Sequence, residues 1–104
     1  CFQIESVTKS NSYYNIALVF PKVECAIRID NIIIINPNNS EDTTHPTIHV
    51  NGTAARMYPL SRLSKGDSLQ ISLTIPASAY ASGTTLSLHI MGDCIGYGKA
   101  VTLP

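Results

Sequence analysis

The stretch that decides the fold is LSKGDSLQISLTIPASAYASGTTLSLHIM, which runs from Leu63 to Met91. Apolar and polar residues alternate in it twice, and the side chains of a β-strand point alternately to the two faces of a sheet. Pro76 ends the first alternating run, and Ser82 and Gly83 form a turn before the second. The stretch therefore predicts two strands, each with one buried and one solvated face. The residues predicted to be buried are Leu69, Ile71, Leu73 and Ile75 in the first strand and Leu86, Leu88 and Ile90 in the second.

Similar alternation outside this stretch predicts further strands. Ile32 to Ile35 is apolar on both faces, which fits a central strand covered twice or a surface that another chain covers. Asp30-Asn31 before it is either a hairpin turn or a bend in one long strand. About eight short strands with regular turns and no helical period predict an all-β protein, either a β-sandwich or a barrel. The other predicted strands are Phe2–Thr8, Tyr13–Phe20, Val23–Asp30, Thr47–Asn51 and Tyr97–Leu103, and Ala54–Leu63 has no clear pattern.

The length of 104 residues predicts a single domain, residues 1–104. Only 13% of the residues are charged, and 7 Lys and Arg balance 7 Asp and Glu. A neutral chain has no basic patch for nucleic acid and no polybasic segment for an anionic membrane. It also lacks the charge repulsion that keeps small proteins apart, which suits a protein that functions in an assembly.

The start at Cys1, without an initiator Met, favours removal of a signal peptide or an anchor. No apolar run reaches the length of about 18 residues that a transmembrane helix needs. Cys1 itself has three interpretations: an arbitrary start of the sequence, a disulfide partner, or the acylated first residue of a lipoprotein.

Three cysteines, Cys1, Cys25 and Cys94, have spacings that match no zinc motif. Cys25 lies on the apolar face of a predicted strand, so we expect a Cys25–Cys94 disulfide in an oxidising compartment. Such a bridge closes a loop of about 70 residues, which stabilises the fold by about 4 kcal/mol. A buried free thiol at Cys25 is the alternative.

Two groups of residues contain the side-chain types of metal sites. The first is the pair His45 and His49, with the acidic residues Glu41 and Asp42 nearby. Pro46 excludes the helix that would align the two histidines, so we expect ordinary polar loop and strand residues here.

The second group, His89, Met91 and Cys94, has the side chains of a blue-copper site. In such sites the Cys precedes the His and Met in the closing loop, whereas here the order is reversed. The sequence also has no nucleophile elbow and no glycine-rich phosphate loop that opens a helix. We therefore expect a protein without enzymatic activity, metal, cofactor or small-molecule substrate.

Asn38-Asn39-Ser40 and Asn51-Gly52-Thr53 are N-glycosylation sequons at the edges of polar loops. A chain this rich in Asn, Ser and Thr contains about one sequon by chance, so their position in loops matters more than their number. Asn38 and Asn51 are the expected glycosylation sites.

The order of features in the second half resembles the β-sandwich domains of archaeal cell-surface filament proteins, the type IV pilins and archaellins with their accessory stator proteins. The similarity covers residues 25–104 and consists of patterns that many immunoglobulin-like domains share. The hydrophobic helix that packs the filament core in that family is missing from this sequence. The matching features are a long strand (Cys25–Asn36), a strand ending in Asn51-Gly52, the turn Leu63–Ser68, the strand it opens, the segment Ser82–Leu88, and a closing hairpin that ends in Ala100–Pro104.

This resemblance implies an immunoglobulin-like antiparallel β-sandwich of about seven to eight strands, secretion, glycosylation and a structural role, and it carries over no catalytic residue. We therefore expect a non-enzymatic structural or adhesive subunit of an extracellular filament or cell envelope. Its partners would be other copies of itself or envelope proteins. The alternatives are the soluble extracytoplasmic accessory domain of a membrane-bound oxidoreductase, with or without copper, and a viral coat or turret protein.

Two segments are the predicted self-association surfaces. A sandwich covers only the inner face of a strand, so two side chains of the isoleucine run need another cover. The N-terminal residues 1–9 form a short strand that could exchange and pair with a neighbour's sheet edge. The alternative is an ordinary N-terminal edge strand, with a loop over the outer isoleucines. The residues concerned are Ile32, Ile33, Ile34, Ile35, Phe2 and Ile4.

Peptide mapping under non-reducing conditions tests the predicted bridge. We expect one cross-linked pair of peptides, which contain Cys25 and Cys94 and separate on reduction, while Cys1 is alkylated without reduction. Recovery of all three cysteines as free thiols would remove the bridge and much of the argument for secretion.

Overall fold

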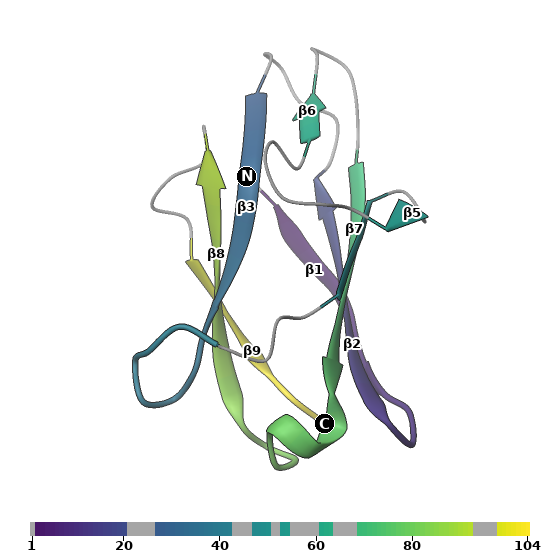
Figure 1. The fold of residues 1–104 in the computed structure, drawn as a ribbon, viewed down its shortest axis with the longest axis vertical. Coiled ribbons are helices and arrows are strands. Elements are labelled where there is room, and N and C mark those ends of the chain that lie inside the picture. The colour runs from purple at the N-terminus through teal and green to yellow at the C-terminus, as the bar shows by residue number, and fades with distance from the viewer. Residues whose placement is uncertain are drawn as a thin grey trace.

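The computed structural model describes residues 2–20, 27–42, 47–50, 53–54, 61–63, 69–92 and 98–104. These residues form two antiparallel sheets and one short 3-10 helix (Figure 1). The elements in chain order are β1 (Gln3–Lys9), β2 (Tyr13–Phe20), β3 (Ile27–Ile35), β4 (Thr47–Val50), β5 (Thr53–Ala54), β6 (Ser61–Leu63), β7 (Leu69–Pro76), η1 (Ala77–Ala79), β8 (Thr85–Gly92) and β9 (Gly98–Thr102).

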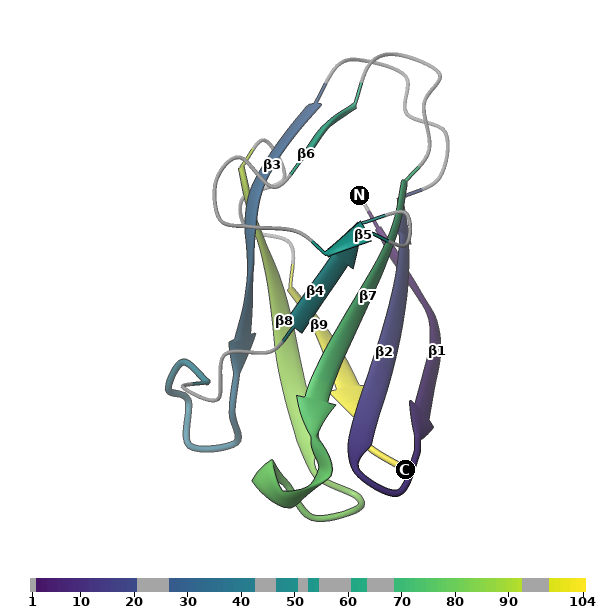
Figure 2. The same cartoon turned by 45° about the vertical axis from the view of Figure 1, so that its right-hand side comes forward.

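One sheet has five strands in the order β1-β2-β7-β4-β5, and the other has four in the order β6-β3-β8-β9. The sheets lie face to face, with one apolar core between them (Figure 2). The prediction of an all-β protein is confirmed, and the arrangement is sandwich-like. In the described part of the chain, no helix has the length and hydropathy needed to cross a membrane.

The central stretch contributes the middle of both sheets. β7 lies between β2 and β4, whereas β8 lies between β3 and β9 in the opposite sheet. The predicted apolar faces are confirmed, although the side chain of Leu69 lies outside the described residues. The buried residues of these two strands, each at most 1% exposed, are Ile71, Leu73, Ile75, Leu86, Leu88 and Ile90.

The connection from β7 to β8 crosses between the sheets and is fixed at both ends. The Ala77 N–H donates to the Ser12 carbonyl in the β1–β2 turn over 2.8 Å. The Gly83 N–H donates to the Leu103 carbonyl after β9 over 2.9 Å. Gly83 has φ +84°, a left-handed conformation that favours glycine, so the predicted Ser82–Gly83 turn is confirmed.

The pairing of β3 with β8 decides whether Asp30-Asn31 is a hairpin turn or a bend in one long strand. The segment is one strand that pairs with β8, and its register shifts by a β-bulge between Ile29 and Asn31. There is therefore no hairpin turn, and the isoleucine run continues the same strand. Val23 and Cys25, predicted to lie on its apolar face, are outside the described residues.

The segment without a clear pattern, Ala54–Leu63, contributes two very short strands at its ends. β5 pairs with β4, and β6 crosses to the other sheet and pairs with β3. β6 pairs with residues 27–29 of β3 only. In the described part of the chain, no strand lies against the remainder of β3 on the side away from β8.

Substitutions on the two faces of β7 test the assignment of its inner and outer sides. Ile71 is 1% exposed in the core, so Ile71→Ala should lower the free energy of unfolding by about 2–5 kcal/mol. Ser72 lies on the outer face, and Ser72→Ala should cost less than about 1 kcal/mol. Chemical denaturation of both variants measures the difference. Equal losses would show that the faces are assigned wrongly.

Candidate self-association surfaces

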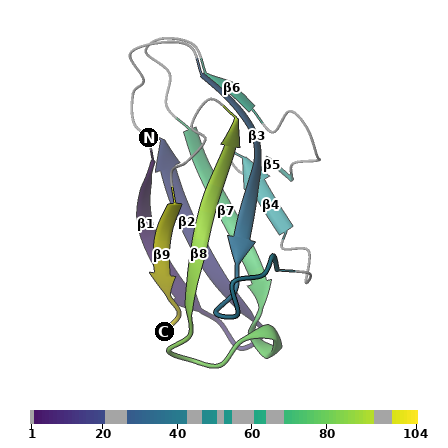
Figure 3. The ribbon, with the colours of Figure 1, turned by 90° about the vertical axis from the view of Figure 1, so that its left-hand side faces the viewer.

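The outer strands β1 and β9 lie on the same side of the molecule, which we call the β1/β9 flank (Figure 3). β1 is the first strand of the five-stranded sheet and β9 the last strand of the other. The Lys99 ammonium of β9 lies 5.3 Å from the centre of the Phe2 ring, which precedes β1. This cation–π contact joins the two sheets at the flank.

Phe2 and Ile4 contact the core of their own chain. Phe2 is 2% exposed, and its ring centre lies 5.7 Å from that of Phe20. Ile4 is half-buried and pairs with Leu18, because β1 pairs with β2 of the same chain. Exchange of residues 1–9 between copies is not visible in a single chain and stays a prediction.

β9 directs alternate backbone groups away from the sheet. The Leu103 N–H donates to the Thr84 carbonyl over 2.8 Å, so residue 103 faces β8. In an antiparallel strand the direction alternates, and the backbone groups of Gly98, Ala100 and Thr102 therefore face away from β8. Their side chains are small, uncharged and exposed. In the described part of the chain, no strand pairs with β9 on this side.

The isoleucine run divides between the two faces of β3. Ile32 and Ile34 are 5% and 3% exposed and belong to the core. Ile33 and Ile35 are half-buried on the outer face, where their β8 partners are His89 and Ser87. Only two members of the run therefore lie on an outer surface.

His89 also lies on this outer face, where it contacts neighbouring residues of β8 and β9. The sequence had suggested it only as a candidate metal ligand. Its Nε2 atom lies 3.1 Å from the Ser87 hydroxyl, and its ring lies over Gly98. A Cβ atom at Gly98 would come within 2.9 Å of the ring. The glycine thus provides the space for the His89 ring, a relation between two strands that their separate patterns could not predict.

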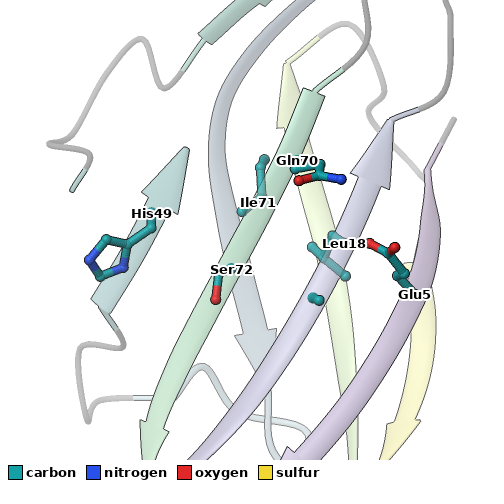
Figure 4. A pocket seen from close by; sticks show the side chains of 7 residues that line it. Glu5, Leu18, His49, Gln70, Ile71 and Ser72 are labelled. Atoms are coloured by element: carbon teal, nitrogen blue, oxygen red, sulfur yellow. The ribbon is translucent and has the colours of Figure 1, made fainter. Parts of the chain in front are cut away.

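The outer face of the five-stranded sheet has a shallow depression between β1, β2, β4 and β7 (Figure 4). Its rim includes Glu5 and His49, which lie on opposite sides of it, with Gln70 and Ser72 between them. The volume of ≈ 130 Å³ is below the roughly 300–1,000 Å³ of ordinary ligand pockets. Because its two titratable side chains lie apart, the depression brings together no acid–base pair.

The candidate metal ligands are only partly described. His89 contacts Ser87, and Met91 lies two residues further along the same face, but Cys94 is outside the described residues. His45 is also outside them, while Asp42 is buried and Glu41 is exposed. Among the residues that the structure describes, no group of three or more His, Cys, Asp or Glu side chains could hold a metal ion.

Most of the predicted disulfide and glycosylation residues are outside the described part of the chain. Cys1, Cys25, Cys94 and Asn51 are outside the described residues. Asn38 is exposed on the turn after β3, where the Asn36 side-chain oxygen accepts hydrogen bonds from the Asn38 and Ser40 N–H groups. Asn39 next to it has φ 62°, a conformation that Asn tolerates in turns. The first sequon is therefore on an exposed turn.

A polar network joins two connections at one end of the sandwich. The Tyr80 hydroxyl donates a hydrogen bond to Asp42 Oδ2, and the Tyr14 hydroxyl donates to the Tyr80 carbonyl over 3.0 Å. Burial of the Tyr80 side chain, its hydrogen bond to Asp42 and the charge of Asp42 raise the pKa of the Tyr80 phenol well above its usual value. Sequence patterns gave no indication of this network.

No protein-family model matches the sequence, and neither the curated proteins nor the solved structures contain a significant match to it.

Spectrophotometric titration of the tyrosines tests the Tyr80 environment. Because the folded state raises its pKa, Tyr80 should stay neutral at a pH at which an unperturbed phenol, with a pKa of about 10, has ionised. The neutral Tyr80 phenol therefore stabilises the folded state fully below about pH 10, and this contribution to the free energy of unfolding should be lost as the pH rises further. Tyr80→Phe should remove the late-titrating phenol, and Tyr13→Phe serves as the matched control. Joint ionisation of all 5 tyrosines near pH 10 in the folded protein would contradict this assignment.

Proposed function

We propose that this chain is an immunoglobulin-like β-sandwich that serves as a structural or adhesive subunit of an extracellular filament or cell envelope. It acts through protein–protein contacts with other copies of itself or with envelope proteins. The extracellular location is supported by the two sequons, by the cysteines and by the resemblance to archaeal filament proteins.

The strand order supports the immunoglobulin-like class. β1-β2-β7-β4 faces β3-β8-β9, the same order as the four-stranded and three-stranded sheets of immunoglobulin constant domains. Two features depart from it: β5 extends the first sheet, and β6 returns to β3 after β4. In antibody domains a disulfide joins the strands that correspond to β2 and β8, whereas here these strands contain no cysteine.

The observation that carries the proposed function is the edge of β9. Natural sheets protect their edges with charged side chains, proline or bulges, since an open edge pairs with other strands. The ammonium of Lys99, the charged residue of β9, lies over the Phe2 ring, 5.3 Å from its centre. Within β9, the outward backbone groups belong to the small, exposed residues Gly98, Ala100 and Thr102. A strand of another subunit can therefore add to this sheet through backbone hydrogen bonds.

A proline at position 100 tests assembly through this edge. The Ala100 N–H faces away from β8, so Ala100→Pro removes no hydrogen bond between β9 and β8 but blocks a strand that would pair with β9. We expect wild-type protein to associate with increasing concentration and Ala100→Pro to weaken this association about tenfold or more. Light scattering measures the mass, and negative-stain electron microscopy shows whether filaments form.

Ala100→Ser is the matched control, because it keeps both the N–H group and a small side chain; it should associate like wild type. The proposal is wrong if Ala100→Pro assembles as strongly as wild type. It is equally wrong if the wild-type protein remains monomeric and does not bind envelope material at about 1 mM, where even an interaction of about 4 kcal/mol is visible.

A further inference from the structure

The second half of β3 forms an edge on the side of the molecule opposite the β1/β9 flank. β6 covers residues 27–29 of β3, and residues 31–35 continue beyond it. The Ile34 carbonyl accepts a hydrogen bond from the Asp42 N–H over 2.8 Å, so residue 34 faces away from β8. By alternation, Ile32 faces the same way. Ile32 and Ile34 therefore present the pairing groups of this edge.

The chain itself caps these groups. The Ile32 N–H donates to the Asn31 side-chain oxygen over 2.8 Å. After the turn at Asn36, the chain returns along the edge, where Glu41 forms a bridge with Ile35 and the Asp42 N–H occupies the Ile34 carbonyl. Among the described residues, this return segment (residues 40–42) is a bridge and not a strand, and two backbone hydrogen bonds join it to the end of β3 and the Asn36 turn, from the Asp42 N–H to the Ile34 carbonyl and from the Asn36 N–H to the Ser40 carbonyl.

The Asp42 side chain fixes the return segment to the other connection. Its carboxylate accepts the hydrogen bond of the Tyr80 hydroxyl, and we call this contact the Asp42–Tyr80 latch. Tyr80 belongs to the connection between β7 and β8, which is itself held by the Tyr14 hydroxyl. Since Asp42 is buried, a hydrogen bond from a neutral phenol to its carboxylate is a strong anchor.

We propose that the Asp42–Tyr80 latch controls a second self-pairing edge: when it opens, residues 31–35 of β3 pair antiparallel with the same residues of a second copy. This interaction uses a different edge from the one assigned to β9, and it does not rest on the proposed function.

The chemistry of the edge favours a second copy of this chain as the partner. An antiparallel pair centred on Ile33 places Ile32 of each copy opposite Ile34 of the other, so that the outward-facing groups of both meet. Residues 31–36 contain no charge, and no like charges oppose each other within the paired segment. The outer side chains Ile33 and Ile35 add β-branched cross-strand contacts. β6 on one side and the Asn36 turn on the other limit the paired length in both copies equally.

Tyr80→Phe opens the latch with the smallest change, because it removes the hydroxyl and keeps the ring. We expect the self-association constant of the full chain to rise about tenfold or more, since hydrogen bonds to charged groups contribute that much. Sedimentation equilibrium measures the constant, and amide hydrogen exchange reports on the Asp42 N–H. Tyr13→Phe, at a tyrosine that is 50% exposed, is the matched control and should change neither quantity.

A second pair of variants separates this edge from β9. Asp42→Ala removes the carboxylate that accepts the Tyr80 hydrogen bond and should reproduce the effect if Tyr80→Phe does not fold. Adding Ile33→Lys should reverse the increase, because two ammonium groups would oppose each other at the centre of the pair. Adding Ala100→Pro should not reverse it, and this result is independent of whether β9 mediates assembly.

Each remaining outcome overturns the proposal. If the Asp42 N–H stays protected in both latch variants, the Asp42–Tyr80 contact does not hold the return segment. If that N–H is released and the self-association constant does not rise, a second copy is not the partner of the edge. If the association survives Ile33→Lys, it occurs at another surface.

Discussion

The contact between the apolar faces of the two sheets is the interaction on which the other features depend. Each sheet contributes aliphatic side chains from alternate positions, and burial of such side chains is the dominant favourable term in folding. Because β7 and β8 belong to opposite sheets, the connection between them must cross the end of the core. This crossing brings Tyr80 to Asp42, so a consequence of core formation is a polar contact between loops that no local pattern specifies.

Two open sheets have edge strands, and the edges at β3 and at β9 differ in how their backbone groups are covered. On one side, Asn31, the Asn36 turn and Asp42 cap the edge of β3 with backbone and side-chain hydrogen bonds. On the other, β9 has small side chains and a lysine whose ammonium lies over the Phe2 ring. A sheet edge can be protected by steric cover or by charge, and the first solution is reversible because it depends on the position of a loop. The difference between the edges is thus a basis for selective association.

The alternation of side chains predicted β2, β7 and β8 closely, because every second residue of each strand, on its inner face, is apolar. Sequence patterns left Asp30-Asn31 undecided, since a bulge and a hairpin turn use the same polar residues, and only pairing with β8 distinguishes them. β6 was unpredictable because three residues are too short for a period. The candidate site was predicted in part. The alternation identified the isoleucine run and indicated that two of its side chains face outward. The position of β9 at the end of its sheet and the Tyr80–Asp42 contact could not be predicted, because they depend on residues far apart in sequence.

The position of the first and last strands has a mechanical consequence. β1 starts toward one end of the long axis of 39 Å, and β9 finishes at the other end (Figure 1). A force that pulls the two ends apart therefore acts along β1 and β9. The hydrogen bonds that join them to β2 and β8 are perpendicular to the strands, so they are loaded in shear and share the force. Pulling both strands from the same end would instead break these bonds one after another, at a lower force.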